Sequence, residues 1–225
     1  SITMAQNQNF DYKVDRFADV EVLRYQVPGF DDLSLKQKTL VYYLTQAALL
    51  GRDILTDQNC KYNLQVRSTL ESIYRNYKGD KTTSDYKNFV VYLKQVWFAN
   101  GIHHHYSMDK FKPAFSQAFF DKQARALPVS QLPLAKGQTK ASFIKLMDKV
   151  IFDPTFMAKR VNLADGQDLI VTSANNLYEG VTQREVEAYY KSIKDTTDAH
   201  PISYGLNTKV VKENGKVVEK PYKVG

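Results

Sequence analysis

The stretch SDYKNFVVYLKQVWFANGIHHHYS, residues 84–107, does most to decide the fold of this chain. From 84 to 99 its apolar residues recur every three or four positions, which is the spacing of one helix face. Asn100 and Gly101 then supply a stop, because both tolerate the left-handed backbone that ends many helices. We therefore expect a core helix over residues 84–99, with a loop placed directly after it. The predicted apolar face consists of Tyr86, Phe89, Val90, Leu93, Val96 and Trp97.

Two further helices are predicted before this stretch. Ser34 and Gln37 form a capping-box pattern, in which each side chain accepts a bond from the other residue's backbone N–H. The second helix runs from about 62 to 77 and is stopped by Gly79. Residues 20–29 precede both helices and are typical of a short extended segment that ends in a Pro-Gly turn.

Three more helices are predicted after it. Pro113 suits the first turn of a helix, where its missing N–H costs nothing. Thr139 caps the next helix, and Thr182 opens a second capping box. Residues 160–181 between them are expected to be loop with short extended pieces, such as 168–171. The side chains expected to face inward from the helix opened by Pro113 are Phe115, Ala118 and Phe119.

The character of the sequence changes near its C-terminal end. Alternating segments at 209–212 and 216–219 flank Asn214 and Gly215, which is a strong hairpin signal. An isolated hairpin is marginal in water. The hairpin therefore packs on the helices or belongs to a sheet that continues beyond residue 225, and we favour the second alternative.

These patterns together predict an α+β fold that is mainly α-helical, with helices packed on the start of a β core. We expect an N-terminal extended segment over residues 1–30. A helical region follows over 31–195, and a truncated β-rich region begins at 196 and runs to 225.

The composition limits the classes of function. Hydrophobic residues make up 43% and charged residues 24%, which is ordinary for a globular protein with a sizeable core. The formal net charge is +7, but the basic residues are scattered among acidic ones, so we do not expect nucleic acid as a partner. Cys60 is the only cysteine, which excludes an internal disulfide and favours a structural role. No run approaches the roughly eighteen apolar residues of a membrane-spanning helix, so no membrane partner is expected.

Three of the four histidines lie together at His103, His104 and His105. Three hypotheses account for them. A metal site is one, although adjacent residues rarely point at one ion with proper geometry. A substrate-contacting loop is the second, since a rigid helix would position it. An ordinary loop whose imidazoles bond nearby backbone is the third, and composition alone favours it.

Several short stretches of the sequence, in order and at matching spacing, are similar to the N-terminal part of dipeptidyl peptidase III. This is a family of zinc-dependent exopeptidases, and the similarity is greatest to bacterial members of the Bacteroides type. The stretch that ends in the histidine run is the most specific of them. The matching stretches are 15–19, 23–30, 35–38, 51–54, 96–107, 159–162 and 204–207.

The resemblance implies part of a two-lobed enzyme that removes dipeptides from the N-termini of short peptides. It implies zinc as cofactor, bound by His-Glu-x-x-x-His and a downstream glutamate in the other lobe. This chain contains no His-Glu pair, so it carries no catalytic or metal-binding residue of that family and is expected to be inactive alone. The residues that the resemblance places in the substrate cleft are His105, Tyr106 and Ser107. Its expected partners are short peptides and the remainder of its own polypeptide.

A different class of function competes with this interpretation. The chain could be a helical protein-interaction module without catalytic activity, related to the peptidase by ancestry alone. A His-Glu-x-x-x-His motif after residue 225 would favour the enzyme, and a stop codon there would favour the module. The expected location is the cytoplasm, or the periplasm if a signal peptide was removed, since none is visible at Ser1.

Overall fold

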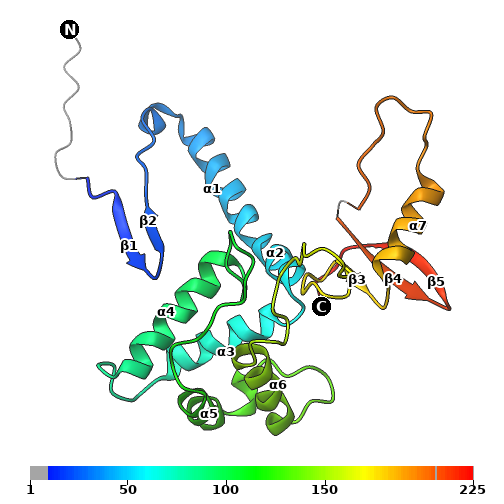
Figure 1. The fold of residues 1–225 in the computed structure, drawn as a ribbon. Helices are drawn as coiled ribbons and strands as arrows, with labels where there is room; N and C mark the ends of the chain where they lie inside the picture. Colours follow the sequence, from blue (N-terminus) through cyan, green and yellow to red (C-terminus); the bar gives the residue numbers. More distant parts are fainter. Residues whose placement is uncertain (1–9, 206, 225) are drawn as a thin grey trace. The chain divides into compact units, whose positions relative to one another are not determined.

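The computed structural model describes residues 10–205 and 207–224 and has an α+β fold in which helices dominate, as predicted (Figure 1). The chain divides into two compact units, Ser1–Leu50 and Gly51–Gly225. The first unit therefore contains the residues predicted as an N-terminal extended segment and the first long helix. No helix in the described part of the chain has both the length and the apolar character needed to cross a bilayer.

The first unit consists of a small ribbon and one helix. Strand β1 (Lys13–Phe17) pairs antiparallel with β2 (Val20–Leu23), and helix α1 (Leu35–Leu50) follows a short 3-10 turn. The predicted capping box is confirmed at its start. The Ser34 backbone N–H donates to Gln37 Oε1 at 2.9 Å, and the Gln37 N–H donates to Ser34 Oγ at 3.3 Å.

The second unit begins with five helices, four of which supply its main core. Their bounds are α2 (Arg52–Asn59), α3 (Asn63–Asn76), α4 (Ser84–Ala99), α5 (Gln117–Ala126) and α6 (Lys140–Phe152). Helices α3, α4 and α6 confirm the predicted segments, and α2 was not predicted. Fully buried side chains from four of these helices meet in one cluster, among them Leu70, Phe89, Leu93, Phe120, Phe143 and Met147.

Helix α5 begins later than predicted. Its cap is Ser116, whose Oγ accepts a bond from the Phe119 backbone N–H at 3.1 Å. Asp85 on α4 holds this cap, since its carboxylate accepts bonds from both the N–H and the hydroxyl of Ser116. Pro113 therefore lies before the helix, and the expected inward position of Ala118 is wrong. The fully buried residues of α5 are Phe120 and Ala124, and Phe115 before the helix is buried as predicted.

The predicted extended piece at residues 168–171 is also wrong. This segment is a turn, because the Asp168 carboxylate accepts bonds from the backbone N–H groups of Ile170 and Val171. The same carboxylate accepts a bond from the N–H of Gln183. These backbone bonds lower the pKa of Asp168 and hold the loop against the next helix.

A three-stranded sheet forms the rest of the second unit. Strand β4 (Thr208–Glu213) pairs antiparallel with β5 (Lys216–Pro221) and parallel with the short β3 (Tyr178–Glu179). Helix α7 (Gln183–Ile193) covers the sheet through a small core. The predicted hairpin and capping box are both confirmed. The hairpin thus already has a third strand and a covering helix, and β3 and α7 lie before the predicted boundary at residue 196.

One partly buried polar network joins the end of the sheet to helix α2. The Tyr222 hydroxyl donates to Asp57 Oδ2 at 2.5 Å, and the Asn176 amide donates to the Tyr222 oxygen at 3.1 Å. Lys209 Nζ donates in turn to Asn176 Oδ1 at 2.9 Å. Burial and the Asp57 carboxylate raise the pKa of Tyr222, so its hydroxyl stays protonated and acts as the donor.

Candidate functional site

The loop that follows α4 carries His103, His104 and His105, and we call it the histidine loop. Two residues with positive φ angles set its direction. Asn100 has φ 53° and Gly101 has φ 148°, so α4 ends where the sequence predicted. The buried side chain of Asn63 fastens this turn. Its amide donates to the carbonyl oxygen of Thr56 at 3.1 Å, and its Oδ1 accepts from the N–H of Ile102 at 3.1 Å.

The loop folds back on itself as a short ribbon. His103 and Lys110 form an antiparallel bridge, and the His104 N–H donates to the Asp109 carbonyl at 2.7 Å. Asp109 bridges Lys159 on the neighbouring segment, where their side chains also form an ion pair at 2.7 Å. These contacts hold the two ends of the loop together, and its tip projects from them.

His103 belongs to the core. Its side chain is 1% exposed, and its Nε2 lies 2.7 Å from the Met157 carbonyl oxygen, which makes Nε2 the protonated nitrogen. Its Nδ1 has no hydrogen-bond partner among the described residues. Burial lowers the pKa of His103 to about 4, so the ring is neutral near pH 7.

Two other titratable groups lie near His103, the half-buried Lys110 and the fully buried Cys60. The Lys110 ammonium donates to the carbonyl oxygens of Asp153 at 2.6 Å and Phe156 at 2.8 Å, and burial lowers its pKa to about 8. Burial raises the pKa of Cys60 to about 11. A protonated, inaccessible thiol is not a nucleophile, which agrees with the structural role predicted for this cysteine.

His104 shapes the tip of the loop. Its Nδ1 accepts bonds from the backbone N–H groups of Tyr106 at 3.1 Å and Ser107 at 3.0 Å. His105 lies between two rings, with centroids 4.3 Å from His104 and 4.9 Å from Phe98. Tyr106 is 86% exposed, and nothing in the described residues covers its ring.

The three residues that the resemblance assigns to a substrate cleft thus lie together on one exposed turn. His105, Tyr106 and Ser107 all have exposed side chains. The Ser107 hydroxyl accepts a bond from the Asp109 N–H at 3.3 Å, which orients it locally. The loop therefore offers a phenol, an imidazole and a hydroxyl from a held backbone.

The geometry gives no support to the metal hypothesis for this loop. His103 points into the core while His105 is on the surface, so the three imidazoles do not converge. In residues 10–205 and 207–224, no group of three or more His, Cys, Asp or Glu side chains is placed to hold a metal ion.

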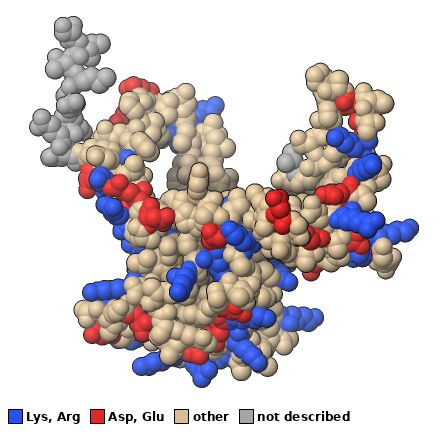
Figure 2. Space-filling model, in the orientation of Figure 1, with Lys and Arg blue, Asp and Glu red and all other residues tan. Residues whose placement is uncertain are grey.

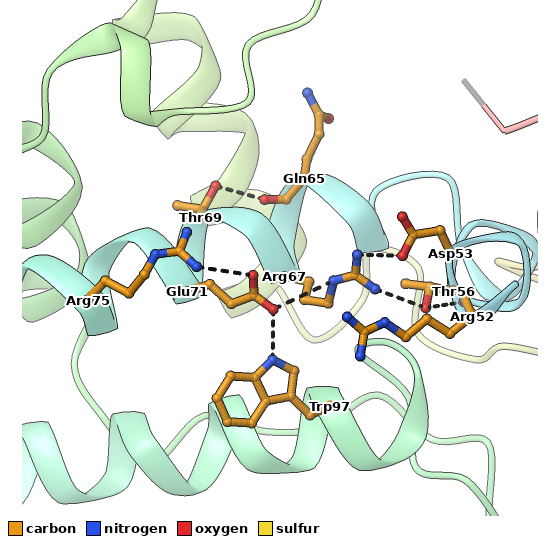
Figure 3. A network of polar contacts seen from close by, with 9 residues as sticks. All are labelled: Arg52, Asp53, Thr56, Gln65, Arg67, Thr69, Glu71, Arg75 and Trp97. Carbon is orange, nitrogen blue, oxygen red and sulfur yellow. Dashed lines mark hydrogen bonds and ion pairs between the residues drawn. The ribbon is translucent and has the colours of Figure 1, made fainter. Parts of the chain in front are cut away.

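A second candidate site lies at the same end of α4, where helices α2, α3 and α4 enclose a cavity of about 450 Å³ (Figure 3). Glu71 is its central side chain. Its carboxylate accepts a bond from Trp97 Nε1 at 2.9 Å and pairs with Arg67 and Arg75, each at 3.7 Å. The residues that line the cavity are Arg52, Thr56, Arg67, Glu71, Tyr74, Arg75, Val96, Trp97 and Asn100.

Sequence reasoning missed this cavity, although part of the signal was visible. Arg67, Glu71 and Arg75 recur every four positions, so they share one face of a predicted helix. Trp97 had been assigned to the inward face of its helix, yet it is 43% exposed. Arg52 could not have been added, because α2 itself was not predicted.

Comparison with known proteins does not assign this chain to a family. A scan of the sequence against family models found no match, and a search of curated proteins found no significant relative. Any function assigned to the chain is therefore a proposal that rests on its own residues.

Proposed function

We propose that this chain forms one wall of the peptide-binding cleft of a zinc-dependent dipeptidyl peptidase. The observation that carries the proposal is the histidine loop. Its base is buried and hydrogen-bonded at His103, and its tip exposes the three residues His105, Tyr106 and Ser107 that the resemblance to dipeptidyl peptidase III assigns to the substrate.

The chemistry of the tip suits an extended peptide. The Tyr106 hydroxyl can both donate and accept, so it can bond a peptide carbonyl or amide, while its ring packs on a side chain. His105 offers a second polar group on the same turn. Because the backbone of the turn is held by His104, little conformational entropy would be lost when a peptide binds.

The zinc and the general base are assigned by this proposal to the remainder of the polypeptide, where the metal would activate a water molecule. The chain described here contributes positioning of the peptide. It follows that residues of the histidine loop should affect peptide binding and leave zinc binding intact.

The test is the substitution Tyr106→Ala in the full parent protein. We expect KM for short peptides to rise by roughly tenfold, the scale of one lost hydrogen bond with its packing, while the zinc content stays unchanged. Steady-state kinetics on a set of short peptides and metal analysis of the same samples measure both quantities.

Tyr25→Ala is the matched control, since Tyr25 is 82% exposed and lies outside the loop. This variant should have unchanged kinetics. If Tyr106→Ala has the same KM and kcat as the unmodified enzyme, Tyr106 has no role in substrate binding. If the parent protein carries no zinc and cleaves no peptide, the peptidase proposal is wrong.

One observation favours the second candidate, a non-catalytic interaction module. Helix α1 buries none of its side chains, although it carries many large apolar residues. Such a surface is typical of a helix that another polypeptide covers. The mass and zinc content of the native protein separate the two candidates. A mass well above 25.8 kDa with bound zinc supports the peptidase, and a metal-free protein of 25.8 kDa supports the module.

A further inference from the structure

The cavity between α2, α3 and α4 has a guanidinium group that no other side chain uses. Arg52 lies at the first position of α2 and lines the cavity. Within residues 10–205 and 207–224 its guanidinium forms no ion pair or hydrogen bond, and Figure 3 shows it beside Arg67 without a partner. Its five N–H donors are therefore free to bind a ligand.

The cavity and its surroundings contain one more arginine than carboxylate. Arg67 donates to Asp53 at 2.7 Å and pairs with Glu71 at 3.7 Å, so it is already held between two carboxylates. Arg75 pairs with Glu71 as well. Three guanidinium groups thus face two carboxylates. The group without a counter-charge is that of Arg52, and it marks where an anion would bind.

Another part of the cavity lining is apolar, and a hydrogen bond fixes the orientation of one of its rings. The indole of Trp97 is fixed by its bond to Glu71, and its ring centroid lies 6.3 Å from that of Tyr74 in an edge-on arrangement. Both rings are 43% exposed, and Val96 completes this side. Exposed aromatic faces of this kind pack against apolar or aromatic groups of a ligand.

The chemistry of the cavity favours a carboxylate over a phosphate. A guanidinium fork binds a carboxylate through two parallel hydrogen bonds. Glu71 lies in the same cavity, and its negative charge would repel a doubly charged phosphate more strongly than a singly charged carboxylate. The single uncompensated charge of Arg52 matches a monoanion.

We propose that this cavity is a binding site for a carboxylate joined to an apolar or aromatic group. Arg52 binds the carboxylate, and Trp97 packs against the apolar part. The ligand is a free aromatic acid or the C-terminal carboxylate of a peptide. This site does not include His105, Tyr106 or Ser107, and it does not depend on the proposed peptidase function.

The only tryptophan of the chain is Trp97, so its fluorescence reports on this site alone when tyrosine is not excited. The 225-residue chain is titrated with 3-phenylpropionate, with the peptide Gly-Gly-Phe as the free acid, and with the same peptide as its amide. We expect a saturable change with both acids and none with the amide. Added NaCl should weaken the binding, since the site is exposed to solvent.

Arg52→Gln should weaken binding of both acids by at least about tenfold, whereas Arg184→Gln, an exposed arginine on α7, should have no effect. Circular dichroism of both variants checks the fold. Tighter binding of the peptide acid than of 3-phenylpropionate assigns the ligand to peptides, and equal binding assigns it to small acids. The proposal is overturned if neither acid binds at about 10 mM, if the amide binds as well as the acid, or if inorganic phosphate binds better than both.

Figure 2 shows why a general basic surface does not explain the site. Lys and Arg side chains on the visible face are interspersed with Asp and Glu. The uncompensated charge of Arg52 is therefore a local property of the cavity, set by which guanidinium groups of the network are already paired.

Discussion

Helices α1 and α4 have 16 residues each and opposite surroundings. Helix α4 buries six side chains, five of them in the main core, whereas α1 buries none. Both helices contain a run of five apolar residues, 40–44 in α1 and 89–93 in α4, but further apolar residues at 86 and 96 extend one face of α4, and it is this face that is buried. The exposed apolar residues of α1 are Leu35, Leu40, Val41, Tyr42, Tyr43, Leu44, Leu49 and Leu50.

The comparison teaches that apolar content and burial are separate properties. An apolar stripe on one face tells where a helix packs, and α4 packs there. A helix that is apolar all round is typical of a fully covered helix, and α1 has apolar residues around its axis although none of its side chains is buried. Four predictions test this difference, from the largest expected effect to the smallest.

Truncation of a buried ring in α4 should have the largest effect. Phe89 is fully buried and contacts the rings of Tyr86, Phe115 and Phe119. We expect Phe89→Ala to lower the free energy of unfolding by about 3–5 kcal/mol, through lost burial and the cavity left behind. Urea denaturation followed by circular dichroism measures it.

The matched substitution in α1 is Leu44→Ala, at a side chain that is 61% exposed. Its effect should stay within about 0.5 kcal/mol, because an exposed position loses little packing and alanine favours helices. A loss as large as that of Phe89→Ala would mean that α1 is buried in solution, and the contrast between the two helices would disappear.

The second prediction concerns the loss of folding stability at low pH. The pKa of His103 falls from its ordinary 6.5 to about 4 in the folded chain, so the unfolded chain binds more protons between these values. Stability is therefore full above pH 6.5 and is lost as the pH falls towards 4, by about 3 kcal/mol in total. Urea denaturation at a series of pH values measures this loss.

His103→Gln keeps a donor for the Met157 carbonyl and cannot titrate, so the acid loss should shrink in this variant. His105→Gln alters an exposed ring on the same loop and should leave the loss unchanged. An equal acid dependence in both variants would show that another group causes it. Helix α1 holds no buried titratable group, so it should not contribute.

The third prediction compares the two helix ends. A Cβ at Gly101 would lie 2.1 Å from Asn63 Nδ2, and φ at this glycine is +148°, which L-residues rarely adopt. Asn63 cannot move without leaving its buried partners. We expect Gly101→Ala to cost at least about 2 kcal/mol, measured by urea denaturation.

Gly51 follows α1 with φ −73° and ψ −15°, which any residue adopts. Gly51→Ala should therefore be neutral or stabilise the chain by up to about 1 kcal/mol, because it reduces the freedom of the unfolded state. The comparison of the two ends fails if both substitutions have the same sign and size.

The smallest expected effect is at the helix caps. The Thr83 hydroxyl accepts a bond from the Tyr86 N–H at 3.3 Å at the start of α4. Thr83→Ala should cost about 1 kcal/mol in the cooperative unfolding transition. Ser34→Ala removes the corresponding cap of α1, and hydrogen exchange should show faster exchange in its first turn with little change in global stability. Equal global costs would mean that α1 unfolds together with the core.

The sequence predicted the elements well wherever local chemistry decides them. The caps at Ser34, Thr139 and Thr182 are confirmed, as is the stop at Asn100, because each depends on bonds within a few residues. The start of α5 was predicted wrongly, because its cap is held by Asp85, a residue from another helix. Only contacts between elements could have placed it.

The candidate sites divide in the same way. The position of the histidine loop followed from the helix before it, and the exposure of Tyr106 agrees with the role that the resemblance gave it, although that role stays a prediction. The inward turn of His103 did not follow from the sequence, since three adjacent histidines look alike. The pairing of His103 with the distant Met157 carbonyl separates it from the other two.

By itself, then, the sequence determined a mainly helical α+β fold, the helix starts at Ser34, Thr139 and Thr182, the stop at Asn100 and the hairpin at Asn214-Gly215, since backbone preferences and short-range hydrogen bonds fix these. The burial of α4 followed from its apolar face, whereas only the tertiary structure showed that no side chain of α1 is buried. The tertiary structure also decided which arginines of the cavity are paired and that Arg52 is left without a counter-charge. These properties depend on side chains that are distant in sequence and meet only when the helices pack.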